Sequence, residues 1–489
     1  MVKHEMNEQQ NNQPQSMRRK VFSGLFWKFG ERITAQVISL IVSIVLARLL
    51  TPHDYGAVSL VMIFITIANV FVSGGFGNSL IQKKNADNLD FSSVFFISIG
   101  IGTTLYVLLF AAAPLIASFY GLPILTPVLR VLGIRIIVAS INSVQHAYVF
   151  RHMLFKRFFW STLFGTLLSG VVGIAMAYHG FGVWSLVAQY LTNTCTDTIV
   201  LWFTVRWRPD FRCSWTRAKG LLSYGWKLLA SSLLDTGYKQ LRSLIIGKKY
   251  TVSDMTYYNQ GDKLPSLIVT NINTTIGHVL FPAMSQVQDD RPRIKQMTRR
   301  AIQISSYIMW PLMIGFAIVA EPFVSLVLTD KWLPCVPFIR IFCLSYGLYP
   351  IQTANLQAIN AIGRSDLSLR LEIIKKVIGF VMILLTMNFG TLVIAYGLLV
   401  TDVIATFVNV LPNRRLLNYN YFEQFRDLLP GLLMSVVMGA VIYPIGGLGL
   451  PDGATIALQV VCGAAVYLLE SVLTRQTAFQ YLVGFLKKR

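Results

Sequence analysis

The chain has 489 residues, of which 54% are hydrophobic and 13% are charged, and its mean hydropathy is +0.56. Soluble domains carry about 25% charged residues, so this composition excludes an ordinary soluble enzyme or binding domain. The apolar segments are about 20 residues long and lack the alternation of β-barrel strands, which favours transmembrane helices. We therefore predict an all-α membrane protein with many spans.

Cysteine and histidine patterns indicate neither disulfides nor a metal centre. The five cysteines are scattered without a CxxC pair, and the six histidines form no HExxH-type motif. We expect no cofactor. The cysteines are interpreted as packing residues: Cys195, Cys213, Cys335, Cys343 and Cys462.

Residues 1–20 form a polar, Asn/Gln-rich segment that we predict to be a disordered tail. About fourteen spans follow it. Gly74–Gly75, Pro265, Pro311 and Pro350 fall inside these spans, where such residues often mark bends. The predicted spans are 22–49, 56–80, 91–118, 124–150, 156–178, 182–205, 221–247, 255–285, 301–328, 335–362, 367–388, 391–412, 428–446 and 455–473.

The loops predict the orientation in the membrane. The chain has 43 lysines and arginines. Most of those that lie outside the spans fall on one side, whereas the opposite side carries Lys248, Lys249 and Lys331. Cytoplasmic loops are the ones enriched in Lys and Arg, so both termini are predicted to be cytoplasmic. The net charge of +21 is then explained by topology and anionic lipids, and we expect no nucleic-acid partner.

An internal repeat of near 200 residues relates the first six spans to the next six. Because six is an even number, the two copies share one orientation and are related by an axis along the membrane normal. The matching pairs are Trp27–Lys28 and Trp226–Lys227, Thr51/Asp54 and Thr251/Asp254, Phe181–Gly182 and Phe389–Gly390, and Thr196–Asp197 and Thr401–Asp402.

The repeat predicts an N-lobe at 21–212 and a C-lobe at 213–418, with the last two spans and a cytoplasmic C-terminus at 419–489. Two six-helix lobes facing a central cavity form a transporter architecture.

Ionisable residues at membrane depth are the candidate site residues, because such groups normally face a bundle interior or a watery cavity. A cationic cavity suits an anionic ligand, and arginine binds phosphate oxygens with two hydrogen bonds. The candidates for substrate binding are Arg48, Arg130, Arg135, Lys239, Arg242, Lys263 and Arg340. The candidates for coupling to H⁺ or Na⁺ are Asp197, Asp235 and Asp402.

Structural explanations remain open for these residues. Asp235 and Lys239 can neutralise each other one helical turn apart, and Arg48, Arg242 and Lys263 can extend to the membrane interface. Intramembrane amides more often join helices by hydrogen bonds than bind sugars. The amides in question are Asn142, Gln145, Asn271, Asn273, Gln352, Asn355 and Gln357.

Nine short motifs run in order from the first span to the eleventh. They are LARLLTPHDYG (46–56), GFGNSLIQKK (75–84), GFGVWSLVAQ (180–189), YGWKLL (224–229), LIIGK (244–248), YY (257–258), VLFPAMSQVQDD (279–290), DKWLP (330–334) and GRSD (363–366). With them the chain resembles the Wzx-like polysaccharide exporters of the multidrug/oligosaccharidyl-lipid/polysaccharide flippase superfamily, in the colanic-acid and teichuronic-acid exporter branch.

The resemblance implies a fourteen-helix flippase of the bacterial inner membrane that works by alternating access. Its implied substrate is an undecaprenyl-diphosphate-linked oligosaccharide for exopolysaccharide, capsule or lipopolysaccharide synthesis. Its implied partners are membrane lipids, a polysaccharide polymerase and glycosyltransferases. Arg48, Arg135, Lys239 and Arg242 are the predicted headgroup contacts.

The sequence favours neither an enzyme nor a primary pump. A membrane enzyme would need an extramembrane catalytic loop with paired acids, and a primary pump would need a phosphate-binding loop, which the sequence does not contain. A peptidoglycan-precursor flippase or a multidrug/cation antiporter of the same superfamily remains the alternative.

Overall fold

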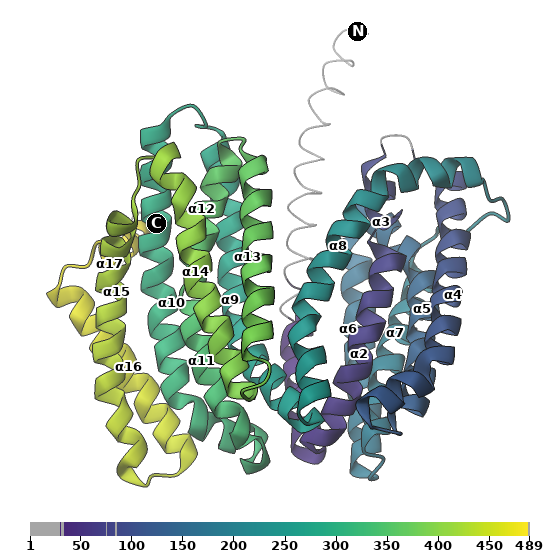
Figure 1. The fold of residues 1–489 in the computed structure, drawn as a ribbon, viewed down its shortest axis with the longest axis horizontal. Helices are drawn as coiled ribbons and strands as arrows, with labels where there is room; N and C mark the ends of the chain where they lie inside the picture. The colour runs from purple at the N-terminus through teal and green to yellow at the C-terminus, as the bar shows by residue number, and fades with distance from the viewer. Residues whose placement is uncertain (1–29, 31–33, 75, 84–85, 488–489) are drawn as a thin grey trace, which may run out of the picture. The chain divides into compact units, whose positions relative to one another are not determined.

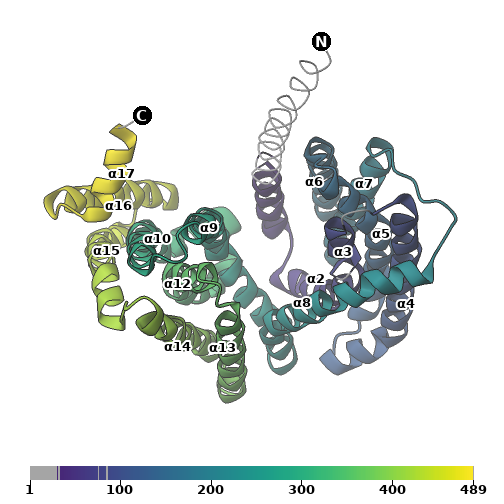
Figure 2. The same cartoon turned by 90° about the horizontal axis from the view of Figure 1, so that it is seen from above.

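The computed structural model describes residues 30, 34–74, 76–83 and 86–487, and within them every regular element is a helix. The predicted tail 1–20, the Trp27–Lys28 pair and the first part of the first span lie outside these residues. The described chain forms two compact units, residues 1–248 and 249–489. Figures 1 and 2 show the helices of each unit from the side and from above.

The first unit begins with an apolar helix at Thr34–Leu49. The helices that follow are α2 (Pro52–Ser73), α3 (Phe76–Gln82), α4 (Asn88–Tyr120), α5 (Leu125–Arg151), α6 (Phe155–Tyr178), α7 (Val183–Thr204) and α8 (Trp215–Lys249).

The second unit packs α10 at its centre, where α10 contacts α9, α11, α12, α15, α16 and α17. In Figure 2, α16 and α17 lie beside α10 and α15 at the edge of this unit. Its elements are α9 (Val252–Ser285), α10 (Arg291–Leu328), the 3₁₀ helix η1 (Asp330–Cys335), α11 (Val336–Gly347), α12 (Tyr349–Ala361), α13 (Ser365–Thr386), α14 (Thr391–Leu416), α15 (Tyr421–Ile442), the 3₁₀ helix η2 (Tyr443–Leu448), α16 (Asp452–Leu473) and α17 (Thr477–Lys487).

The observed helices follow the predicted spans. Ten helical segments among the described residues are long and apolar enough to cross a membrane. Two predicted bends are real breaks: α2 ends at Ser73, before Gly74, and Pro350 lies at the start of α12. Pro265 and Pro311 lie inside continuous helices, and α17 was not predicted.

Equivalent turns confirm the internal repeat. Thr51 and Thr251 each cap a helix by accepting a hydrogen bond from the backbone of an aspartate three residues later. Their backbone angles are φ −87°, ψ 157° and φ −94°, ψ 157°. Gly182 and Gly390 precede α7 and α14 with φ of 52° and 108°, a region that favours glycine. The two halves therefore build the same threonine cap, and each places a glycine with positive φ before the sixth helix of its repeat.

The surfaces of the helices match a lipid environment. Large apolar side chains such as Leu115, Phe203 and Val171 are more than 60% exposed. Polar side chains are buried instead, as in the cluster of Asn355, Gln424 and Asn413, whose amides bond to one another at 2.7–3.0 Å. These bonds are of the kind expected for intramembrane amides, which join helices where no water is available.

The boundary between the compact units lies after Lys248, whereas the repeat places the boundary between lobes at 212/213. Two adjacent lysines lie at the boundary. The Lys248 ammonium bonds to the Phe119 carbonyl at the end of α4, and that of Lys249 bonds to Asn388 in the second unit. The helix α8 thus belongs to the first compact unit although it opens the second repeat.

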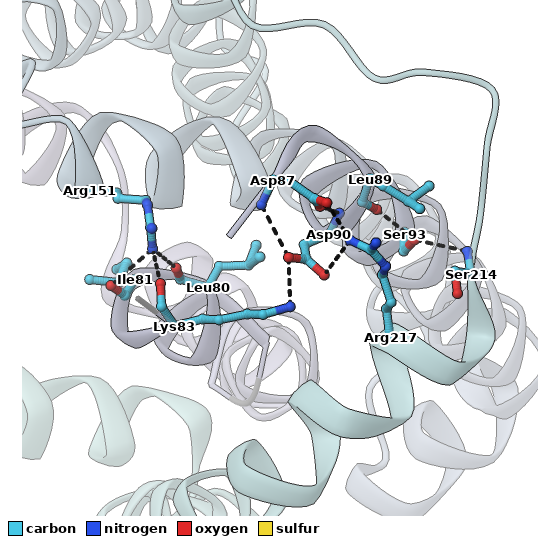
Figure 3. Close-up of polar contacts among 10 residues, drawn as sticks. All are labelled: Leu80, Ile81, Lys83, Asp87, Leu89, Asp90, Ser93, Arg151, Ser214 and Arg217. Atoms are coloured by element: carbon cyan, nitrogen blue, oxygen red, sulfur yellow. Dashed lines mark hydrogen bonds and ion pairs between the residues drawn. The ribbon is translucent and has the colours of Figure 1, made fainter. Parts of the chain in front are cut away.

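At the start of α8, far from Lys248 along the helix, a buried carboxylate joins α8 to α4 (Figure 3). Asp90 is fully buried and lies 2.7 Å from the Lys83 ammonium and 3.6 Å from the Arg217 guanidinium. Arg217, in the first turn of α8, also donates to Asp87, the residue that caps α4. Two cations therefore compensate one buried charge.

Further bonds hold the segment between α7 and α8 over the start of α4. The backbone N–H groups of Asp210 and Ser214 donate to the hydroxyls of Ser92 and Ser93, both at 2.9 Å. Nearby, Arg151 donates to the Leu80 carbonyl at 2.7 Å at the end of α3 (Figure 3). This corner of the first unit is thus fixed by polar contacts from four helices.

The hydrogen bond from Arg217 is the largest cause that lowers the pKa of Asp87 to about 2 from its ordinary 3.8. A carboxylate with a lowered pKa stabilises the fold above its unfolded-state pKa, and the effect is lost as the pH falls through the folded value. The Arg217–Asp87 contact is therefore retained at every pH above about 4 and is lost as the pH falls toward 2.

Removing both cations while keeping the buried acid should destabilise the first unit. We expect Lys83→Met/Arg217→Met to lower the unfolding free energy by about 3–5 kcal/mol, because an uncompensated charge then remains buried. Adding Asp90→Asn should recover at least half of the loss. The measurement is equilibrium unfolding of the purified chain in detergent.

The matched control is Asp366→Asn, which breaks the exposed Arg364–Asp366 pair and should change the unfolding free energy little, as is usual for exposed ion pairs. A triple variant no more stable than the double variant would contradict a charge-based role for Asp90.

Candidate functional site: a polar pocket in the first unit

A polar pocket of about 390 Å³ lies within the first unit, among α2, α3, α5 and α7. Its lining combines one cation, one carboxylate, an imidazole, amides and hydroxyls. The polar residues that line it include Asn69, Ser73, Arg135, Asn142, His146 and Asp197.

The helix α5 supplies three of these side chains. Arg135, Asn142 and His146 are spaced by seven and four residues, so they project from one face of the helix. Asp197 comes from α7, which packs closely on α6 through a row of small buried residues. That row is Ser161, Gly165, Ser169 and Gly173, spaced by four. A Cβ atom on Gly173 would meet the Gln189 side chain at 3.0 Å, so the close approach of the two helices requires glycine there.

Asp197 accepts three hydrogen bonds from side chains. Asn142 Nδ2 donates at 2.6 Å, His146 Nε2 lies at 3.0 Å, and the Ser161 hydroxyl donates as well. These bonds account for a carboxylate placed among helices, where an unsatisfied charge would be costly.

Arg135 is the cation of the pocket. Its Nε donates to the Thr194 hydroxyl at 2.8 Å, and its guanidinium lies 5.4 Å from the centre of the Tyr190 ring. No carboxylate forms an ion pair with Arg135 within the described part of the chain. Arg135 also lines a second cavity of about 370 Å³ with Gln36, Gln189 and Asn193. Its charge is therefore available to an anion that enters either space.

The other candidates in the first unit lie elsewhere. Arg130 donates to the Phe110 carbonyl at 3.5 Å and lies over the Phe110 ring. Lys239 and Asp235 form an ion pair at 2.7 Å, as the structural explanation proposed. Arg242 is buried over the Tyr238 ring, and Arg48 is exposed near the end of the first helix. Of the first-unit candidates, Arg135 and Asp197 line the same pocket.

The remaining candidates belong to the second unit. Arg340 pairs with Glu321 at 3.1 Å and lines a different cavity, described below. The buried Asp402 accepts a hydrogen bond from the Ser345 hydroxyl, and Lys263 is exposed on α9. In both halves a side chain from the fourth helix of the repeat thus donates to the aspartate of the sixth.

Sequence reasoning missed His146 and Ser161 as partners of Asp197. The spacing of His146 from Asn142 and Arg135 on one predicted helix was the available signal, because residues separated by four and seven share a face. Ser161 carried no signal beyond the small-residue row.

These helices and this pocket define a multi-pass membrane protein with a polar interior site. The family model for polysaccharide biosynthesis proteins matches residues 45–337, more than half of the chain, and the chain belongs to this family.

Two curated relatives match along nearly the whole chain. The lipopolysaccharide biosynthesis protein WzxC of Escherichia coli (strain K12) is 24% identical over 449 residues, covering 87% of this chain and 89% of WzxC. The teichuronic acid biosynthesis protein TuaB of Bacillus subtilis (strain 168) is 24% identical over 470 residues, covering 93% of this chain and 95% of TuaB.

Solved structures share the fold. The lipid II flippase MurJ in an inward closed conformation aligns with a TM-score of 0.74 and 14% identity, over 92% of this chain and 98% of MurJ. An inward-facing multidrug resistance MATE family transporter of the MOP superfamily aligns with a TM-score of 0.61 and 16% identity, over 78% of this chain and 94% of that chain. The predicted flippase fold is confirmed.

If the pocket binds an anionic headgroup, Arg135→Gln should reduce transport about 10- to 100-fold, the loss expected for a charged hydrogen bond worth roughly 1.5–3 kcal/mol. The measurement is polymer export by cells expressing equal amounts of inserted protein. Arg135→Glu should abolish export.

Arg130→Gln, five residues earlier on α5, is the comparison for this test because that side chain lies over Phe110. A larger loss with Arg130→Gln than with Arg135→Gln would show that the pocket is not the anion site.

Proposed function

We propose that this chain is a flippase that moves an undecaprenyl-diphosphate-linked oligosaccharide repeat unit across the bacterial cytoplasmic membrane by alternating access. The glycan then enters exopolysaccharide, capsule or lipopolysaccharide synthesis. The chain itself carries out transport and no covalent chemistry.

Arg135 carries this proposal. A guanidinium at membrane depth that lines two polar cavities suits the diphosphate of a lipid-linked substrate, because it can donate two parallel hydrogen bonds to phosphate oxygens. The Arg135 guanidinium would repel a cationic drug that entered either space, which disfavours such a cargo. Membership of the polysaccharide biosynthesis family supports the same substrate class.

Asp197 and His146 are proposed to couple transport to H⁺. Both residues line the pocket, and His146 Nε2 lies 3.0 Å from Asp197 Oδ2. Buried acids in membrane proteins commonly carry protons or Na⁺. Asp235 is less suited to this role because it is ion-paired with Lys239. Asp402 is an alternative coupling residue in the second unit.

Deleting the gene from its host should cause a lipid-linked oligosaccharide to accumulate and should stop polymer export. The wild-type chain should restore export when it is supplied on a plasmid. The measurement is mass spectrometry of the lipid extract together with polymer quantification.

Two outcomes would favour the alternatives. Drug sensitivity with normal polymer would indicate a multidrug/cation antiporter. Rescue of a strain depleted of its lipid II flippase, with polymer export unaffected by the deletion, would indicate a peptidoglycan-precursor flippase.

Both termini are proposed to be cytoplasmic. Alkaline phosphatase, which is active outside the cytoplasm, should be active when fused after Gly447 and inactive when fused after Asn418. The reverse pattern would invert the topology, because these two loops are separated by one predicted span.

A further inference from the structure

The second unit contains a separate cavity of about 520 Å³ formed by α10, α11, η2 and α16. This volume lies in the range of about 300–1,000 Å³ that is typical of small-molecule sites. The polar residues that line it include Glu321, Arg340, Tyr443, Asp452, Thr455 and Gln459. The cavity lies beside the turn between the last two spans, which is predicted to be extracytoplasmic.

Gln459 gives the first reason to expect a ligand here. Its side chain is only 2% exposed, and its Nε2 donates to the Ile442 carbonyl at 3.2 Å. Its Oε1 atom is buried and accepts no hydrogen bond from any described residue. Buried polar atoms are nearly always paired, so this acceptor, at the wall of the cavity, calls for a donor. A ligand hydroxyl or amide would supply it.

The charges exclude a simple anion as the occupant. Glu321 and Arg340 neutralise each other at 3.1 Å, and Arg340 also donates to the Ala317 carbonyl at 3.3 Å. Asp452 adds a third charge, so the lining carries one formal negative charge in total. A free phosphate or an anionic lipid headgroup would meet net repulsion.

The donors and acceptors suit a hydroxyl-rich molecule. The carboxylates and the Gln459 carbonyl accept hydrogen bonds, whereas the Arg340 guanidinium donates them. The Tyr443 ring is 70% exposed and provides a flat apolar surface with a polar end. Sugars present hydroxyl groups at their edges and apolar C–H faces, which matches this combination.

Glycines leave the space open. In η2, a Cβ atom on Gly446 would lie 3.6 Å from Gln459 Nε2, so a side chain there would extend over the wall of the cavity. A Cβ atom on Gly447 would meet nothing within 4 Å. Larger residues in this turn would therefore fill the cavity without a clash of the backbone.

We propose that this cavity is a glycan subsite that binds a neutral sugar segment of the transported oligosaccharide at the extracytoplasmic side. The inference rests on the proposed function, since it names the part of the substrate that the second unit recognises.

The test uses the purified full-length chain in nanodiscs and two soluble probes, lactose and cellobiuronic acid, with binding followed by saturation-transfer-difference NMR. We expect lactose to bind and the carboxylate-bearing probe to bind more weakly. Gln459→Leu should weaken lactose binding at least about ten-fold, the factor equivalent to one lost hydrogen bond. Gly446→Leu should abolish it.

Gln480→Leu on α17 is the matched control, because it removes an exposed amide outside the cavity and should leave lactose binding unchanged. Melting temperatures show whether each variant is folded, and Gln459→Leu decides the test if Gly446→Leu is not. The subsite is overturned if lactose does not bind, if it binds both cavity variants as it binds the wild type, or if phosphatidylglycerol competes for the cavity better than lactose.

Export in the deletion strain separates this inference from the proposed function. Export by the wild type together with unchanged lactose binding in Gln459→Leu would refute the subsite alone. Failure of the wild type to restore export would refute the flippase, and lactose binding would then decide the subsite independently.

Discussion

The free-energy cost of holding charged groups away from water governs where the ionisable side chains of this protein lie. A charge at the centre of a bilayer costs at least about 2.5–3.5 kcal/mol, so each such group needs a partner or a watery space. Asp90 is compensated by two cations, and Asp197 accepts hydrogen bonds from three side chains. Arg135 is different, because its hydrogen bonds go to neutral groups, the Thr194 hydroxyl and the Met62 sulfur. The positive charge that remains is what gives the first-unit pocket its chemistry.

The two cavities differ in charge in the way that a lipid-linked sugar requires. The first-unit pocket contains an arginine without an ion-paired acid in the described chain, which suits phosphate. The second-unit cavity carries one formal negative charge, an exposed tyrosine ring and a buried amide oxygen that lacks a donor, which suit hydroxyl groups. A chain with a single cationic cavity, as the sequence suggested, would have no separate place for the glycan.

The sequence predicted local structure well because local structure depends on short-range chemistry. Apolar segments of sufficient length became helices, and the threonine–aspartate pairs of the repeat became matching caps. The pair Asp235–Lys239 was also foreseeable, since residues four apart meet on a helix. Partners distant in sequence were not foreseeable. The contact between Arg217 and Asp90 spans more than a hundred residues, and so does that between Lys249 and Asn388.

The sequence by itself determined the class of the protein, the order of its spans, its internal repeat and its family. Those properties reside in composition, periodicity and motif order, which the linear chain displays directly. Only the tertiary structure decided that Arg135 and Asp197 share a pocket, that Arg130 does not line it, and that Arg340 lines a different cavity. The reason is physical: a helical pattern fixes which face a side chain occupies, but packing fixes what that face meets.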